Sequence, residues 1–478
     1  MVTKTIVFSP FSRLEGDLEV RVDIEDGRIA RALASGTLYR GFELMLRGRD
    51  VMDAIVIACR VCGQCGAAHS AAAAAAIRAV AGTEMPRNAY LASNVMQGIE
   101  SILSHLTHFY LSFAPDLAEP PEEEEIQRLL PPAGGSFTRA LRAREDILGV
   151  MGLFAGKWPN TLAIQPGGTT KPLSASEIRR ARGLLGEFGE FIRQQMIGCE
   201  LDEWLALGSG ADLDRWLGEG AHAASDMGIF IRFSLAHGLD RIGTWPAHFL
   251  SSGGWPGPTG ETLMRPGFHD GDAGEFSPAK IAEHVKHSWY SGQEGGVSPF
   301  EGESDPAPER AEAYSWTKAP RYGGRPAEVG PLARMVNDRD PLVTDLLARH
   351  GPCVFVRETA RLHEVVRLLH QVDVWLAEVD PEEPFYRETP RTVSGSGVAV
   401  VEAPRGMLGH WLRVEGGKIR NYQIVTPTGW NLSPRDSDGC PGPLETALVG
   451  TPVADPERPT VMAHVVKSFD PCLFCTVH

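Results

Sequence analysis

Two Cys-x-x-Cys motifs lie near opposite ends of this 478-residue chain. Cys62 and Cys65 form the first motif, and Cys472 and Cys475 form the second. A tight turn in each motif brings both thiolates to the same side, so two such motifs can form a metal site with four sulfur ligands. Structural zinc sites usually take their cysteine pairs from one short segment that folds locally. A site made from these motifs would close almost the whole chain on itself, which favours a deeply buried metal centre and leaves the metal unidentified.

The other cysteines bear on which sulfurs bind metal. Eight cysteines in so long a chain are too few for a disulfide scaffold. Cys59 stands three residues before Cys62, so the residues alone leave open which sulfurs of this segment are ligands. A thioredoxin-like redox pair would need a βαβ setting, which neither motif has. The default interpretation of Cys199, Cys353 and Cys440 is that of small buried apolar residues.

The periodicity of apolar residues predicts an α+β fold in which helices predominate. Residues 4–38 alternate between apolar and polar side chains, as a small antiparallel sheet does, with a turn at 25–27. The last quarter returns to strands around a Gly-Gly turn at 416–417. We therefore expect a central bundle of long helices with small antiparallel sheets at its periphery. Alanine-dense segments and apolar spacings of three to four residues predict helices over 66–80, 88–113, 136–154, 175–206 and 355–378.

Length predicts either one large composite fold or a few closely packed domains. We expect one composite domain over 1–478. Gly and Pro accumulate between 252 and 325 with little periodicity, so we expect an irregular surface excursion there. The parts of the domain are then N-terminal strands over 1–38, a helical core over 50–250, the excursion over 252–325, and a final part over 326–478 with helices, strands and the second cysteine motif.

Charge and hydropathy exclude several classes of partner. The net charge is −15 and no basic stripe is present, which disfavours nucleic acid. No apolar run approaches the length that spanning a bilayer requires, so we expect no direct membrane insertion. The N-terminus alternates like a strand and lacks the regions of a secretion signal. We expect a cytoplasmic protein, with a periplasmic location as the alternative if a partner carries an export signal.

The cysteine motifs belong to a longer series of motifs. Residues 60–69 read RVCGQCGAAH and residues 470–478 read DPCLFCTVH. In both, the chain resembles the large, catalytic subunits of nickel-iron hydrogenases, whose motifs are RxCGxCxxxH and DPCxxCxxH. The resemblance is closest to the cytoplasmic uptake and hydrogen-sensing group. It extends through RLEG at 13–16, YRGFE at 39–43, HLTHFY at 105–110, QPGG at 165–168, EAPRG at 402–406, GHW at 409–411 and NYQI at 421–424.

The resemblance implies an active site buried between the N- and C-terminal segments. Cys62 and Cys472 would bind nickel terminally, whereas Cys65 and Cys475 would bridge nickel to an iron. In the family that iron carries carbon monoxide and two cyanides. The match selects Cys62 over Cys59, and soft thiolates suit both metals.

Further residues take implied roles around the metals. Pro404, Arg405 and Thr428 fall where the family surrounds the diatomic ligands, and an arginine donor beside a cyanide makes a charge-assisted hydrogen bond. His69 falls beside a bridging sulfur, where it would orient and polarise the thiolate.

A second metal site, usually magnesium in the family, is implied at Glu43, the Ile424 carbonyl and His478. Carboxylate, carbonyl and water oxygens are the ligands that Mg²⁺ prefers, and an imidazole is less typical. His105 and His108 stand three apart on one predicted helix, and we interpret them as core or supporting groups and not as ligands.

The implied reaction is the reversible, heterolytic oxidation of H2 to protons and electrons. Cys472 is the first choice of base for the proton, and Glu15 would relay the proton outward. Arg405 is a rival by position, but a guanidinium gives up its proton very reluctantly, so we assign it to positioning and electrostatics. The chain has no spare cysteine cluster for iron-sulfur relays. The family supplies one in an iron-sulfur small subunit, which implies an obligate heterodimer, with a dimer of heterodimers left open.

Three features depart from the commonest family pattern, although none removes a metal ligand. Gln64 replaces a small aliphatic residue, Ser104 stands where many members have Asp, and residues 156–160 lack a histidine. Catalytic members lose a C-terminal extension after nickel insertion and hydrogen sensors are made without one, so a chain that stops at His478 fits both. The alternative function is an H2-sensing subunit that signals to a kinase. A quinone-module subunit of respiratory complex I is disfavoured, because that relative has lost the cysteines.

Overall fold

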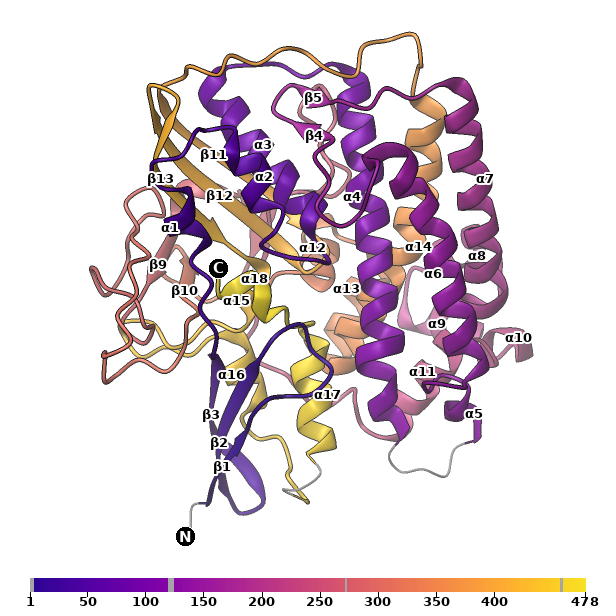
Figure 1. The fold of residues 1–478 in the computed structure, drawn as a ribbon. Helices are drawn as coiled ribbons and strands as arrows, with labels where there is room; N and C mark the ends of the chain where they lie inside the picture. The colour runs from indigo at the N-terminus through magenta and orange to yellow at the C-terminus, as the bar shows by residue number, and fades with distance from the viewer. Residues whose placement is uncertain (1–3, 119–123, 271–272, 456–458) are drawn as a thin grey trace.

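A bundle of long helices forms one side of the molecule (Figure 1). The computed structural model describes residues 4–118, 124–270, 273–455 and 459–478, so residues 1–3 of the predicted N-terminal strands lie outside it. Helix α4 packs against α6 and α14, and α7 packs against the same two helices, which closes the bundle. Its members are α4 (Arg87–Thr107), α6 (Gly135–Ala155), α7 (Ala175–Phe191) and α14 (Val354–Glu378).

Helix α3 (Gly66–Ala81) begins directly after the first cysteine motif and lies across a three-stranded antiparallel sheet. The contact is close because α3 is rich in alanine and the facing strand has Gly397, where an added Cβ would lie 2.3 Å from the Ala76 carbonyl oxygen. These small residues set the position of α3 and therefore of Cys65, which precedes its first turn. The strands are β11 (Gly395–Ala403), β12 (Gly406–Glu415) and β13 (Lys418–Val425).

The N-terminal sheet lies below these elements in Figure 1 and consists of β1 (Lys4–Phe8), β2 (Leu18–Glu25) and β3 (Arg28–Gly36). Asp26 and Gly27 have positive φ angles, as a two-residue hairpin turn requires. The predicted sheet and its turn are confirmed. Strand β3 packs on α16 (Pro443–Leu448), which connects this sheet to the C-terminal part of the chain.

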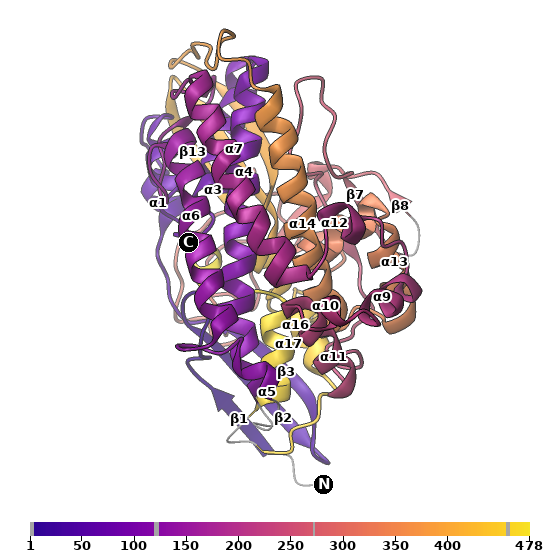
Figure 2. The same cartoon turned by 90° about the vertical axis from the view of Figure 1, so that its right-hand side faces the viewer.

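Shorter elements surround the bundle and the sheets (Figure 2). Among the described residues, no helix combines the length and apolar composition that crossing a membrane requires. The shorter helices are α1 (Phe42–Leu46), α2 (Asp53–Ala58), α5 (Glu124–Gln127), α8 (Leu201–Leu205), α9 (Gly210–Leu217), α10 (Gly220–Ala223), α11 (Asp226–Ala236), α12 (Pro331–Asp338), α13 (Pro341–His350), α15 (Pro427–Asn431), α17 (Thr460–Ser468) and α18 (Leu473–Thr476). The shorter strands are β4 (Ile164–Gln165), β5 (Gly168–Thr169), β6 (Phe249–Ser251), β7 (Gly267–His269), β8 (Ala273–Gly274), β9 (Ile281–His284) and β10 (Ala319–Tyr322).

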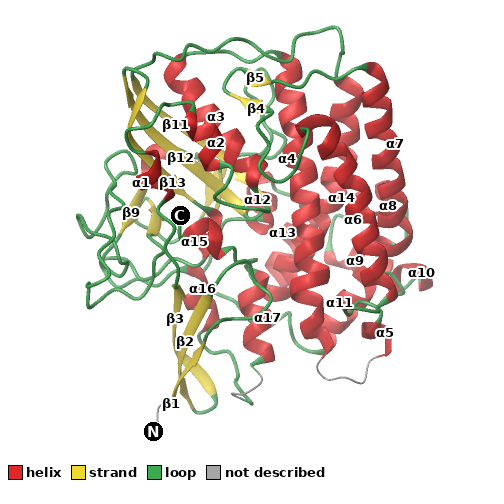
Figure 3. Ribbon diagram, in the orientation of Figure 1, coloured by secondary structure: helices red, strands yellow, loops and turns green. Residues whose placement is uncertain are grey.

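The predicted fold class is confirmed, since helices predominate and the sheets are small and antiparallel (Figure 3). Two predicted helices are interrupted by π-helical turns. The helix predicted over 88–113 is α-helical to Thr107 and continues as a π-helix over His108–Phe113. The helix predicted over 175–206 passes through a π-turn at Ile192–Ile197 and breaks at Gly198, whose φ of 71° is left-handed. The spacing of apolar residues continues through both π-helical turns. The sequence pattern therefore predicted continuous helices and did not predict the turns.

The segment 252–325 is irregular, but its inner side belongs to the core. Ser304 and Lys318 are buried, and the Lys318 ammonium lies 3.4 Å from the Glu43 carboxylate. The prediction of a surface excursion therefore needs correction for this inner part. Frequent Gly and Pro indicate an irregular backbone, which is a different property from exposure.

Candidate metal centre

The two cysteine motifs meet in the interior of the molecule. The Sγ atoms of Cys62 and Cys472 are 3.7 Å apart, and those of Cys65 and Cys475 are 3.4 Å apart. A third contact of 3.0 Å joins the sulfurs of Cys472 and Cys475. All four side chains are buried and none forms a disulfide. The predicted gathering of four thiols from opposite ends of the chain is present in the structure.

Cys59 lies outside this group. Its thiol donates to the carbonyl oxygen of Val56 at 3.3 Å, within its own helical turn. The structure thus separates Cys59 from Cys62, which the residues alone left open.

The N-terminal loop before β2 holds the second motif in place. The backbone of Glu15 pairs with that of Cys472 as a parallel bridge, and the Leu473 N–H donates to the Glu15 carbonyl at 2.6 Å. The Thr428 hydroxyl accepts from the Cys472 N–H at 3.0 Å. Two segments that are remote in sequence from the motif therefore fix Cys472, and Thr428 contributes through the backbone of the motif.

Gln64 links two of the predicted site residues. Its side-chain amide donates to the Glu15 carboxylate, and its carbonyl oxygen accepts from Arg405 Nη2 at 2.5 Å. Burial raises the pKa of Glu15. Sequence reasoning identified Gln64 only as a departure from the family pattern and missed this bridge.

Arg405 is buried and stays charged. Its Nε lies 3.2 Å from the Asp470 carboxylate and also donates to the Asp470 carbonyl at 3.1 Å. Burial alone lowers the pKa of Arg405, but Asp470 and the neighbouring cysteine sulfurs hold it well above the ordinary value. Asp470 also lies 3.2 Å from His108, which in turn lies 2.8 Å from Glu358. His108 is thus a supporting group, as predicted, whereas the role of Asp470 was missed although it begins the DPCxxC motif.

His69 and Pro404 complete the surroundings of the cysteines. His69 is fully buried, and its Nδ1 lies 3.2 Å from His410 Nε2. Burial lowers the pKa of His69 to about 4, so its ring is neutral at physiological pH. Pro404 is buried, and its carbonyl accepts from Arg334 at 3.0 Å.

Glu43 and His478 form a second group beside β13. His478 Nδ1 donates to the Cys475 carbonyl at 2.6 Å, and Nε2 lies 3.3 Å from the Glu43 carboxylate. Glu43 accepts from the Ile424 N–H at 2.7 Å. Burial alone raises the pKa of Glu43, but Lys318 and His478 lower it to about 2, so the carboxylate is ionised. The predicted residues are together, and the sequence carried no signal for Lys318.

The family model for nickel-dependent hydrogenase matches residues 40–122 and 240–478. The chain belongs to the nickel-dependent hydrogenase family. The periplasmic NiFeSe hydrogenase large subunit of Desulfomicrobium baculatum is 30% identical, with 99% of this chain and 94% of that protein covered. The Hydrogenase-2 large chain of Escherichia coli strain K12 is 27% identical, with 100% and 97% covered. The solved Ni-Fe-Se hydrogenase from D. vulgaris Hildenborough in the reduced state has a TM-score of 0.88 at 30% identity, with 100% of both chains covered.

These relatives confirm the predicted hydrogenase large subunit and its enzyme class. The residues around the sulfurs also fit a metal group that carries hydrogen-bond acceptors. In the described part of the chain, Arg405 Nη1 is buried without a partner, and so is His69 Nε2. Buried polar groups are rarely left unpaired, so an acceptor is expected beside the Arg405 donor.

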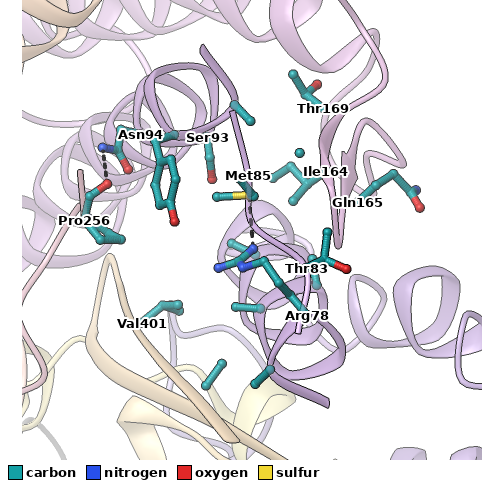
Figure 4. A pocket seen from close by; sticks show the side chains of 18 of the residues that line it. Arg78, Thr83, Met85, Ser93, Asn94, Ile164, Gln165, Thr169, Pro256 and Val401 are labelled. Atoms are coloured by element: carbon teal, nitrogen blue, oxygen red, sulfur yellow. Dashed lines mark hydrogen bonds between the residues drawn. The ribbon is translucent and has the colours of Figure 1, made fainter. Parts of the chain in front are cut away.

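A cavity of about 570 Å³ lies elsewhere in this hydrogenase, between α3, α4, the β4–β5 hairpin and β11 (Figure 4). Arg78 donates to the Met85 sulfur at 3.1 Å, and Asn94 donates to the Pro256 carbonyl at 3.0 Å. The lining includes neither the four cysteines nor any other predicted site residue. We therefore assign this cavity no part in the metal centre.

Proposed function

We propose that this hydrogenase subunit oxidises H2 reversibly to protons and electrons at a nickel-iron centre held by four cysteines. The main support for this proposal is that the sulfurs of the two cysteine motifs lie together in the interior. In this assignment Cys62 and Cys472 would hold nickel, and Cys65 and Cys475 would be shared by nickel and iron. When bound, such a centre supplies the Lewis acidity that makes H2 a proton donor.

The sulfur of Cys472 is the base in this proposal, and Glu15 carries the proton toward solvent. The pairing of the Glu15 backbone with Cys472 supports this order, as does the partial exposure of Glu15. Because burial raises its pKa, the Glu15 carboxylate holds a proton more readily than an exposed glutamate does. Gln64 keeps this carboxylate oriented.

Four further residues bind and shape the metal group. Arg405 Nη1 would donate a charge-assisted hydrogen bond to a cyanide of the iron, and Pro404 and Thr428 would lie near its cyanide and carbon monoxide ligands. The charge of Arg405 makes it a positioning group and not a base. Neutral His69 would orient a neighbouring thiolate of the centre.

A magnesium ion is proposed at Glu43, the Ile424 carbonyl and His478. The ionised Glu43 carboxylate and the buried imidazole of His478, 3.3 Å from it, support a cation there. A cavity of about 10 Å³ lined by Ile424 and His478 has room for about one small ion or water. Such an ion ties residues next to Cys475 to the sheet.

The electrons need a partner, and we propose an iron-sulfur small subunit in an obligate heterodimer. The relatives are named as large subunits or chains, which supports this partner. A dimer of heterodimers and a cytoplasmic location stay predictions. One relative is named as periplasmic, which keeps that alternative in view. These relatives lend no support to a sensor role.

An infrared spectrum tests the centre directly. One carbonyl band and two cyanide bands that shift on addition of H2 are expected from the purified, metal-replete protein. The Cys475→Ser variant should lack them. Absence of all three bands from the parent protein would return the four cysteines to an ordinary zinc or iron site.

A further inference from the structure

A second cluster of side chains that could hold a metal ion lies across the helix bundle from the sheet β11–β13 (Figure 1). Cys199, Glu203 and His222 place a sulfur, a carboxylate oxygen and a ring nitrogen within 4.8 Å of one another. Cys199 follows the break at Gly198, Glu203 lies on α8, and His222 lies on α10. Helices α8 and α10 are at the edge of the molecule in Figure 1. No residue of this cluster belongs to the cysteine motifs.

The hydrogen bonding of His222 prepares one ring nitrogen for a metal. His222 is buried, and its Nδ1 lies 3.0 Å from the carbonyl oxygen of Trp216. A carbonyl can only accept, so Nδ1 carries the hydrogen and Nε2 has the lone pair in the neutral ring. That nitrogen lies 3.5 Å from the Glu203 carboxylate. The Trp216 indole stacks on the imidazole ring of His222, with 5.1 Å between the ring centroids, and fixes the plane of the imidazole. Metal-binding histidines characteristically have this kind of support.

The sulfur of Cys199 is prepared by the same tryptophan. Trp216 Nε1 donates to Cys199 Sγ at 3.4 Å, a contact that favours a thiolate. Burial nevertheless raises the pKa of Cys199 to about 11, so the thiol is protonated at neutral pH without a metal. Metal binding would therefore release a proton. Glu203 is 49% exposed, which leaves it free to rotate and gives an ion access from solvent.

We propose that Cys199, Glu203 and His222 bind a zinc ion. One sulfur, one imidazole and one carboxylate suit the borderline-soft Zn²⁺ ion, whose tetrahedral shell would keep a fourth position for water. The ligands come from one short segment, as in locally folded zinc sites. The ion would join the end of the π-turn and α8 to α10. This proposal is independent of the nickel-iron assignment.

Zinc binding can be measured on the intact, metal-replete protein. We expect one zinc per chain in addition to nickel and iron, measured by mass spectrometry of the metals. The variants Cys199→Ser and His222→Phe should bind Zn²⁺ at least about tenfold more weakly in a chelator competition. His222→Phe keeps an aromatic ring against Trp216 and removes the nitrogen donor. Nickel content reports separately on the hydrogenase centre.

Two variants serve as matched controls. Cys353→Ser removes another cysteine whose pKa burial raises to about 11, away from this cluster. Glu219→Gln removes a carboxylate on the Nδ1 side of His222, at 3.8 Å. Both should bind zinc as the parent does. If Glu219→Gln lost zinc binding as much as His222→Phe does, His222 would instead be charged and ion-paired with glutamates. That result would overturn the proposed zinc site.

A measurement on the parent chain covers the case in which variants fold poorly. Zn²⁺ should slow alkylation of Cys199 at least about tenfold, measured on the peptide that contains it, and leave alkylation of Cys440 unchanged. Alkylation of Cys199 that is indifferent to Zn²⁺ would overturn the proposal.

Discussion

The two cysteine-containing clusters of this hydrogenase are built over very different lengths of chain. In the proposed nickel-iron centre, 410 positions separate Cys62 from Cys472 and Cys65 from Cys475. The cluster of Cys199, Glu203 and His222 lies within one short segment at the edge of the bundle. The first therefore requires that every layer of the fold be in place, whereas the second needs only local structure. Partial unfolding should therefore disrupt the four-cysteine cluster before it disrupts the cluster of Cys199, Glu203 and His222.

Removing a ligand of the long-range centre should have the largest effect. We expect Cys475→Ser to abolish H2-dependent dye reduction and to lose nickel and iron, because among the described residues no fifth thiol joins the four-cysteine cluster to replace it. Zinc content should be unchanged, which sharpens the comparison. Cys59→Ser, in the neighbouring turn, is the control and should keep both metals. Full activity in Cys475→Ser would break the assignment.

Glu15→Gln should have the next largest effect. The amide cannot relay a proton, so isotope exchange between D2 and water should slow by about a hundredfold or more. Nickel and iron should stay bound, since Glu15 holds Cys472 through its backbone. Glu19→Gln on β2 is the control. Unaltered exchange would remove Glu15 from the relay.

Gln64→Leu should have a smaller effect on the same measurement. The substitution leaves a buried N–H of Arg405 without its acceptor, at a cost of about 1–3 kcal/mol in the free energy of unfolding. Because Glu15 also loses its orienting donor, we expect exchange to slow by about tenfold, less than in a variant without the carboxylate. A stability loss with unchanged exchange would limit Gln64 to a structural role.

The smallest effect is expected at Glu445 on α16, which accepts a hydrogen bond from the Ala34 N–H of the N-terminal sheet at 3.1 Å. Burial raises the pKa of Glu445 to about 7, and the Tyr314 hydroxyl donates to it at 2.7 Å. The folded state therefore holds the Glu445 proton more tightly than the unfolded chain, whose pKa is near 4.5. Stability from this group is present below about pH 4.5 and is lost as pH rises to about 7.

Glu445→Gln should flatten this pH dependence in thermal unfolding between pH 4.5 and 7. The amide oxygen can keep the bond from Tyr314. In the parent chain, nickel retention should weaken over the same pH range more than zinc retention does. An identical pH profile in the variant would assign the dependence to other groups.

Local order was predictable from the sequence, and long-range side-chain contacts were not. Apolar periodicity predicted the helices, and alternation together with the turn at Asp26 and Gly27 predicted the N-terminal sheet. The four cysteines were predictable because their spacing is itself a chemical pattern, and the family resemblance selected Cys62 over Cys59. The bridge from Glu15 through Gln64 to Arg405 joins three remote segments, and no spacing rule encodes it. Lys318 was missed for the same reason, since composition suggested only an irregular surface.

The two cysteine motifs also have a topological consequence. With metals bound to both, residues 62–475 become a closed ring that includes the helix bundle. One backbone cut inside this ring, for example by a protease in the segment 252–325, would leave two fragments still tied together. Such a nicked chain would separate into pieces only when denaturant and metal removal act together. The bound metals would therefore hold the two fragments together even after the chain unfolds.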